Sequence, residues 1–159
     1  MPCWANWYGG SRNYTGDIAM EIQNIKEAIE QSFGRQKLMA AYGAKITITE
    51  PGSVSVMVPA KEFLLRTSGI FHGGVIAATA DTAAGYAAVS CGPTHTNFLT
   101  VEFKINFLNK AKGDWLVAKA SVLKNGRTLT VVSVDVFVQT GDIGNKAAVA
   151  LVTLIKDNK

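Results

Sequence analysis

The spacing of apolar residues in the first third of the chain changes from a helical to a strand period. From Ile18 to Phe33 apolar residues recur every three or four positions, which predicts an amphipathic helix that ends at Gly34. From Ala44 to Val58 apolar and polar residues alternate, interrupted by Pro51-Gly52, which predicts a two-stranded hairpin. Residues 1–17 follow neither period. We therefore expect a flexible tail over 1–17 and a single domain over 18–159.

The second half of the chain alternates in the same way. Four segments predict strands, over residues 98–107, 115–124, 128–139 and 146–156. In the first of them Leu99, Val101 and Phe103 are expected to share one face, with Thr100 on the other. Asn125-Gly126 predicts a two-residue hairpin turn between the second and third.

Between these strand regions lies FHGGVIAATADTAAGYAAVS, residues 71–90, which reads as one helix that is apolar nearly all round. A helix without a polar face is expected to be covered by other elements. An antiparallel sheet curled around it would provide that cover, and its many alanines would let the strands approach closely. The predicted class is therefore α+β.

The composition and charge of the chain exclude several classes of function. The chain has 159 residues with 16 Lys and Arg against 12 Asp and Glu, and no basic run interleaved with aromatic residues. Nucleic acid binding is therefore not expected. No apolar run is long enough to span a membrane, and no basic start precedes an apolar stretch, so we expect a cytoplasmic protein. Two cysteines and two histidines make a structural metal site improbable.

Asp81 and the glycine pair that opens the central helix are the main chemical candidates. The first amides of a helix have no partner within it, so Gly73 can donate to an oxyanion. Asp81 lies eight residues on, or ~12 Å along the axis, too far to act on the same carbonyl. If both are catalytic, two antiparallel copies of the helix must combine them, and the protein must be at least a dimer. A tight turn at Gly73 and a structural, hydrogen-bonded carboxylate at Asp81 are the plainer alternatives.

Two neighbouring residues also have two possible roles. His72 either acts as a base or orients the glycine loop through hydrogen bonds, and the second role is favoured. Thr100 either contacts a water or Asp81, or is an ordinary cross-strand threonine.

Several motifs together resemble the hotdog-fold acyl-CoA thioesterases, and in particular the phenylacetate-degradation branch. They are His72-Gly73-Gly74 with Asp81 nine residues after the histidine, Gly85-Tyr86-Ala87-Ala88, and the segments 32–39, 100–107 and 126–130. The similarity extends from about residue 18 to the end of the chain.

The resemblance implies a sheet wrapped around the long helix, assembled as a homodimer that contains the site and often as a homotetramer. It implies an acyl-CoA substrate, with no cofactor besides the CoA that the substrate carries. By matching positions, Gly73 polarises the thioester carbonyl, Asp81 acts as nucleophile or as base for water, and Thr100 helps to place the water. Gly74 and Thr82, next to these groups, are counted as substrate-binding.

One departure from the family pattern concerns the loop before His72. The branch usually has Gln or Asn five or six residues before the histidine, where this chain has Arg66 and Thr67. Arg66 is expected to pair either with Asp81 or with a CoA phosphate. Lys124 and Arg127, which flank the Asn125-Gly126 turn, are further candidates for CoA phosphates, although hairpin tips often carry solvated charges.

The leading hypothesis is a thioesterase that hydrolyses acyl-CoA to a free acid and CoA. The first alternative is a non-catalytic acyl-CoA binding protein, motivated by Arg66. The second is a hotdog hydratase or dehydratase, which would need a histidine paired with an acidic group.

Overall fold

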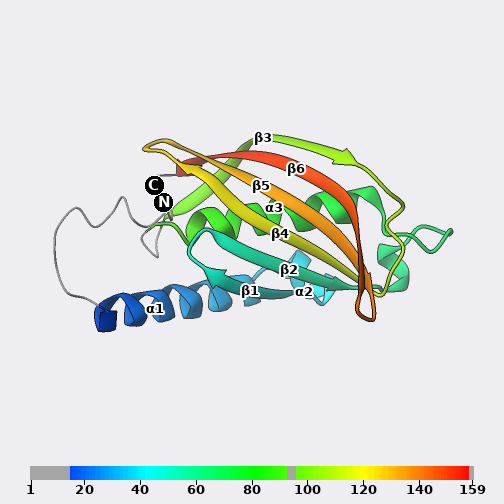
Figure 1. Cartoon of the computed structure of the whole chain (residues 1–159), viewed down its shortest axis with the longest axis horizontal. Helices are drawn as coiled ribbons and strands as arrows, with labels where there is room; N and C mark the ends of the chain where they lie inside the picture. Colours follow the sequence, from blue (N-terminus) through cyan, green and yellow to red (C-terminus); the bar gives the residue numbers. More distant parts are fainter. Residues whose placement is uncertain (1–14, 93–95, 158–159) are drawn as a thin grey trace.

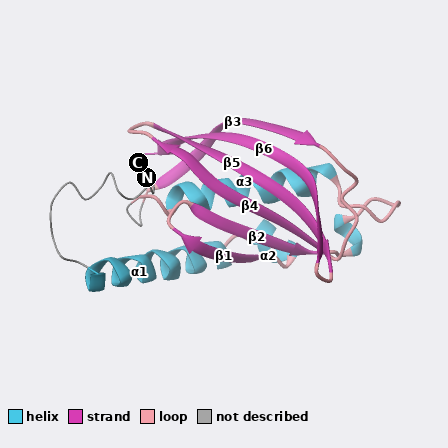
Figure 2. Cartoon of the chain, viewed as in Figure 1, coloured by secondary structure: helices cyan, strands magenta, loops and turns pink. Residues whose placement is uncertain are grey.

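A six-stranded antiparallel sheet curls around one long helix, α3 (Gly73–Val89), in the computed structural model, which describes residues 15–92 and 96–157 (Figure 1). The strands are β1 (Lys45–Glu50), β2 (Ser53–Pro59), β3 (Asn97–Phe107), β4 (Trp115–Asn125), β5 (Leu129–Thr140) and β6 (Ile143–Asp157). Their order in the sheet is β1-β2-β4-β5-β6-β3. The long strands β4, β5 and β6 pass in front of α3 in the view of Figure 2. The predicted α+β class is confirmed.

Alanine side chains allow the sheet to pack directly on α3. Ala80, Ala83, Ala84 and Ala87 are fully buried, and valines of β2 and β5 complete the core around them. One stripe of the helix is less covered than the rest. Its half-buried members include Gly73, Ala77, Asp81, Gly85 and Val89. The helix is therefore not enclosed on all sides by its own sheet.

Strand β3 contains a bulge that reverses the predicted alternation. Thr100 pairs with Leu154 and Glu102 with Thr153, which leaves Val101 as an extra residue in the ladder. Leu99 and Val101 are 56% and 55% exposed, whereas Phe103 packs against the core. The prediction that Leu99, Val101 and Phe103 share one face was wrong, because the extra residue shifts the period.

Three helical segments differ from the predicted pattern. Helix α1 (Thr15–Gly34) begins three residues before Ile18, so the end of the predicted tail is helical. The rest of that tail, residues 1–14, lies outside the described residues. A short helix α2 (Lys37–Tyr42) and a 3-10 turn η1 (Glu62–Leu64) were not predicted. Both are too short to show a helical period.

The two hairpins of the second half also differ from the prediction. β4 ends at Asn125 and β5 begins at Leu129, so residues 126–128 form the connection, and the predicted two-residue turn at Asn125-Gly126 was wrong. Thr140 pairs with Ile143, so the next hairpin is tighter than the expected six-residue loop. Gly141 occupies this turn with φ of 56°, a conformation that glycine adopts at little cost.

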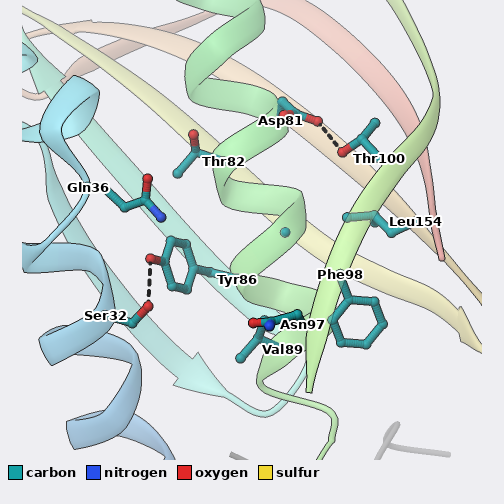
Figure 3. A pocket seen from close by; sticks show the side chains of 11 residues that line it. Ser32, Gln36, Asp81, Thr82, Tyr86, Val89, Asn97, Phe98, Thr100 and Leu154 are labelled. Atoms are coloured by element: carbon teal, nitrogen blue, oxygen red, sulfur yellow. Dashed lines mark hydrogen bonds between the residues drawn. The ribbon is translucent and has the colours of Figure 1, made fainter. Parts of the chain in front are cut away.

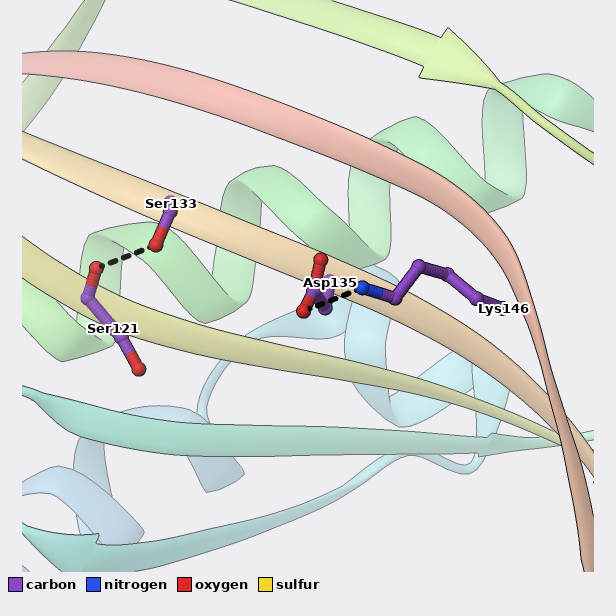
Figure 4. Close-up of polar contacts among 4 residues, drawn as sticks. All are labelled: Ser121, Ser133, Asp135 and Lys146. Carbon is purple, nitrogen blue, oxygen red and sulfur yellow. Dashed lines mark hydrogen bonds and ion pairs between the residues drawn. The ribbon is translucent and has the colours of Figure 1, made fainter.

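The face of the sheet that points away from α3 carries a polar cluster on β4, β5 and β6 (Figure 4). Lys146 Nζ lies 2.9 Å from an Asp135 oxygen, and the ammonium groups of Lys119 and Lys146 lie 5.2 and 5.5 Å from the Phe137 ring centre. Ser133 donates to the carbonyl of Ser121 at 3.3 Å. The ion pair is half exposed, so we expect it to contribute about 1 kcal/mol or less.

Across residues 15–92 and 96–157, no helix has the length and apolar character needed to cross a membrane.

Candidate functional site

Asp81 lies in a pocket of about 280 Å³ between α3, the start of β3 and the end of α1 (Figure 3). The Thr100 hydroxyl donates to Asp81 Oδ1 at 2.7 Å. Of the alternatives left open for Thr100, the structure shows the contact with Asp81. The bond restrains one oxygen of a carboxylate that lines this pocket. The bulge after Thr100 makes this possible, since it lets Thr100 and the core residue Phe103 both face α3.

The N-terminal end of α3 is organised by His72. Its Nδ1 accepts a hydrogen bond from the Gly74 amide at 3.2 Å, and its carbonyl accepts from the amides of Val75 and Ile76. His72 is therefore the N-cap of the helix, which agrees with the favoured orienting role. The Gly74 amide is used by this cap.

The Gly73 amide is the remaining donor at this end of the helix. Within residues 15–92 and 96–157 no acceptor is bonded to it. The helix dipole adds partial positive charge at the same point. A Cβ built on Gly73 would lie 3.4 Å from the Phe107 ring, an ordinary contact, so the fold itself does not require glycine here. The free amide and the missing side chain leave room for an oxygen atom of a ligand.

Gly73 lines a second pocket, of about 430 Å³. Its walls are largely apolar, from Ile70, Phe71, Ile76, Phe107 and Leu108, and it also includes the cationic residues Arg66 and Lys110. No residue lines both this pocket and the one that contains Asp81. Within one chain, the Gly73 amide and the Asp81 carboxylate thus belong to separate compartments, as the ~12 Å helical rise between them requires.

The other predicted site residues are dispersed. Thr82 lines the Asp81 pocket, whereas Arg66 lines the Gly73 pocket. Thr67 is exposed and lines neither. Lys124 and Arg127 are exposed at the β4–β5 hairpin. Asn125 of this hairpin donates to the carbonyl of Cys91, just beyond the C-terminal end of α3, at 3.1 Å. One chain does not bring them to either pocket.

Several pocket residues were missed by the sequence analysis. They are Ser32, Gln36, Tyr86 and Asn97 beside Asp81, and Lys110 beside Gly73. Ser32 and Gln36 lie where α1 ends and α2 begins, and no periodicity indicates that this junction meets α3. Tyr86 was noted within a motif, but its contact with Ser32 depends on tertiary packing.

Comparison with known proteins identifies the family. The thioesterase superfamily model matches residues 68–144. Human acyl-coenzyme A thioesterase 13 is 30% identical over 116 residues, which is 71% of this chain and 81% of that protein. A thioesterase family protein from Silicibacter pomeroyi is 36% identical, with a TM-score of 0.79 over 83% of this chain and 97% of that one.

The Escherichia coli PaaI protein of the phenylacetic acid degradation operon has the same fold. Its TM-score is 0.74 at 19% identity, over 86% of this chain and 95% of that one. The segment of this chain that the family model matches contains both Gly73 and Asp81. Together with the sheet wrapped around α3, these matches show that the chain belongs to the thioesterase superfamily, has its hotdog fold, and is a thioester hydrolase.

Proposed function

We propose that the protein hydrolyses acyl-CoA thioesters at a site shared by two copies of the chain. Asp81 of one copy would work opposite the Gly73 amide of the other. The observation that carries this proposal is the separation of the two groups. An anchored carboxylate and an unpaired helix amide lie on one half-buried stripe of α3, but in different pockets.

A second copy would also cover surfaces that one chain leaves open. β3 is an edge strand, and it exposes Leu99 and Val101. An uncovered edge with apolar side chains is a common site of strand pairing between chains. The α3 stripe lies next to this edge, because Thr100 of β3 contacts Asp81 of α3. We therefore take a homodimer as the smallest active assembly; a homotetramer follows from the family resemblance.

The chemistry that this arrangement supports is addition of an oxygen nucleophile to the thioester carbonyl. If Asp81 is the base, it takes a proton from water while the oxygen bonds to the carbonyl carbon. The oxyanion that forms would be held by the Gly73 amide. Collapse then breaks the C–S bond, and the CoA sulfur leaves as a thiolate that takes up the proton. If Asp81 is itself the nucleophile, its carboxylate oxygen bonds to the carbonyl carbon, the C–S bond breaks and the CoA thiolate leaves. Water then cleaves the acyl-enzyme anhydride, which regenerates Asp81, and the Gly73 amide would hold the oxyanion in both steps.

The Gly73 pocket supports CoA as the leaving group. CoA carries a diphosphate and a further phosphate, and Arg66 and Lys110 place two cations at this pocket. In one chain Arg66 lies with Gly73 and not with Asp81. In a shared site, Asp81 of the other copy would lie opposite Gly73, so the location of Arg66 fits both a CoA phosphate contact and a pair with Asp81 between copies.

Hydrolysis of acyl-CoA is tested by initial rates over phenylacetyl-, benzoyl- and straight-chain acyl-CoAs, with thiol release as the readout. We expect turnover of at least one ester, about 10⁶-fold or more above the rate in buffer alone, which is the lower end of enzymatic accelerations. Saturable binding of every ester without thiol release would instead support the non-catalytic binding protein. Hydration of an enoyl-CoA would support the hydratase, although His72 is engaged as a helix cap.

Thr100→Val is expected to lower kcat about 10-fold with little change in KM. Valine keeps the shape of threonine but removes the hydroxyl that holds Asp81, so the carboxylate loses its fixed orientation. Thr100→Ser keeps a hydroxyl and should recover most of the loss. The matched control is Thr153→Val, because Thr153 donates to Glu102 at 3.3 Å on the exposed side of the sheet. Equal losses in Thr100→Val and Thr153→Val would contradict the role of Thr100.

A further inference from the structure

The Asp81 pocket extends across α3 to a pair of hydroxyl groups on its other side. Figure 3 shows the Asp81–Thr100 contact on one side of the helix and Tyr86, directed toward Ser32 of α1, on the other. The Ser32 and Tyr86 hydroxyls are 3.2 Å apart. Tyr86 lies five residues beyond Asp81, or ~7.5 Å further along the helix axis. The pocket therefore offers hydrogen-bonding groups at both of its ends.

Gly85 lies between these two ends and keeps the space open. It lines the pocket, it lies in the interior of α3, and a Cβ built on it would meet no atom within 4 Å. Glycine in a helix interior is less favourable than alanine, and packing within the chain does not require it here. The bare backbone at this point leaves room for a bound group to lie across the helix.

The charges of the two pockets differ in a way that orients the substrate. Among the described residues that line the Asp81 pocket, Asp81 carries the one charge, and the rest of its polar lining consists of hydroxyl and amide groups. Arg66 and Lys110 lie in the other pocket. The anionic CoA portion is therefore favoured beside Gly73, and an uncharged group is favoured beside Asp81.

We propose that the acyl group of the substrate lies across Gly85 in the Asp81 pocket, and that the Ser32–Tyr86 hydroxyl pair recognises a neutral hydrogen-bonding substituent at its far end. This inference rests on the proposed acyl-CoA hydrolysis and adds the substrate class. Tyr86 is 8% exposed and carries its hydroxyl on a rigid ring packed edge-on against Phe33, at 5.5 Å between ring centres. A hydroxyl so fixed discriminates against a ligand that cannot bond to it.

The test compares matched esters that differ by one hydroxyl: phenylacetyl-CoA with its 4-hydroxy form, and hexanoyl-CoA with its 6-hydroxy form. We expect the wild-type protein to prefer a hydroxylated ester in kcat/KM. Tyr86→Phe and Ser32→Ala should each reduce this preference about 2- to 10-fold, as expected for loss of one neutral hydrogen bond. Tyr42→Phe, at the end of α2 and outside the pocket, is the control and should leave the preference as it is.

Gly85→Ala tests the path of the acyl group separately. The added methyl meets no atom of the chain, so the melting temperature should equal or exceed that of the wild type. The kcat/KM for phenylacetyl-CoA relative to acetyl-CoA should fall at least 5-fold, roughly the effect of one misplaced methyl group in a pocket. Gly34→Ala is the control, because Gly34 also has open space around its Cβ position but does not line the pocket.

The outcomes separate this inference from the proposed hydrolysis. If the wild type binds the esters without releasing thiol, hydrolysis fails and the same preferences are measured as dissociation constants. A wild type with no preference for either hydroxylated ester, or a preference that Tyr86→Phe and Ser32→Ala leave intact, would overturn the recognition role. A Gly85→Ala protein that changes its oligomeric state would show that a second copy, and not the acyl group, occupies the space.

Discussion

Asp81→Asn is expected to lower kcat about 10²- to 10⁴-fold, the contribution typical of a positioned proton-transfer group. Asparagine has the same shape as aspartate, and its carbonyl oxygen can still accept the hydrogen bond from Thr100. The folded state should therefore persist while the proton acceptor or nucleophile is lost. Thiol release from the best acyl-CoA measures the loss of activity. Thermal unfolding and the mass in solution show whether the fold and the assembly are kept.

The matched control is Asp135→Asn on the outer face of the sheet. It makes the same chemical change at a carboxylate whose partner is Lys146, remote from both pockets. Its activity should equal that of the wild type, and its free energy of unfolding should change by about 1 kcal/mol or less. A folded Asp81→Asn protein that hydrolyses as fast as the Asp135→Asn protein would disprove the assignment of Asp81.

Mixing two inactive variants should restore activity if the site is shared between copies. Gly73→Val covers the helix amide with a side chain, and the exposed Phe107 ring can move to accommodate it. A dimer of one Asp81→Asn chain and one Gly73→Val chain then contains one site with both defects and one site with none. Random pairing makes half of the dimers mixed, so about a quarter of wild-type activity should return.

The recovery is measured after the two variants are unfolded together and refolded, or co-expressed with different tags and purified through both. Each variant treated alone supplies the background rate. A mixture that stays at the background, although mass measurements show that mixed dimers have formed, would place the complete site within a single chain. Activity in a strictly monomeric wild type would lead to the same conclusion.

The central helix and the positions of Gly73 and Asp81 on it could be predicted from the sequence, because they depend only on residues close together in the chain. A run of small apolar residues interrupted by one aspartate predicts a covered helix with an unusual carboxylate. The structure confirms the helix and buries most of it, but Asp81 lies on a stripe that is only half-buried. The spacing of Gly73 and Asp81 fixes their separation along a helix before any fold is known. These properties depend on neighbouring residues and on helix geometry, which a sequence specifies directly.

The parts that were missed depend on contacts between distant segments. The bulge at Val101 leaves no mark in an alternating pattern, yet it decides which residues of β3 face the helix. The contact between Ser32 and Tyr86 joins residues 54 positions apart, and the helix α1 that carries Ser32 has no strand register to fix its place. Lys110 follows β3 in a loop, where periodicity makes no prediction.

The half-buried stripe of α3 has a geometric consequence for any symmetric pair. Gly73, Ala77 and Asp81 are spaced by four residues and so follow one another along the same side of the helix. If residue 73 of each copy faces residue 81 of the other, the rotation axis that relates them must cross the helix at its midpoint, beside Ala77. A methyl group at that crossing keeps the two backbones close. A bulky side chain there would force both reaction centres apart at once, although it would touch neither.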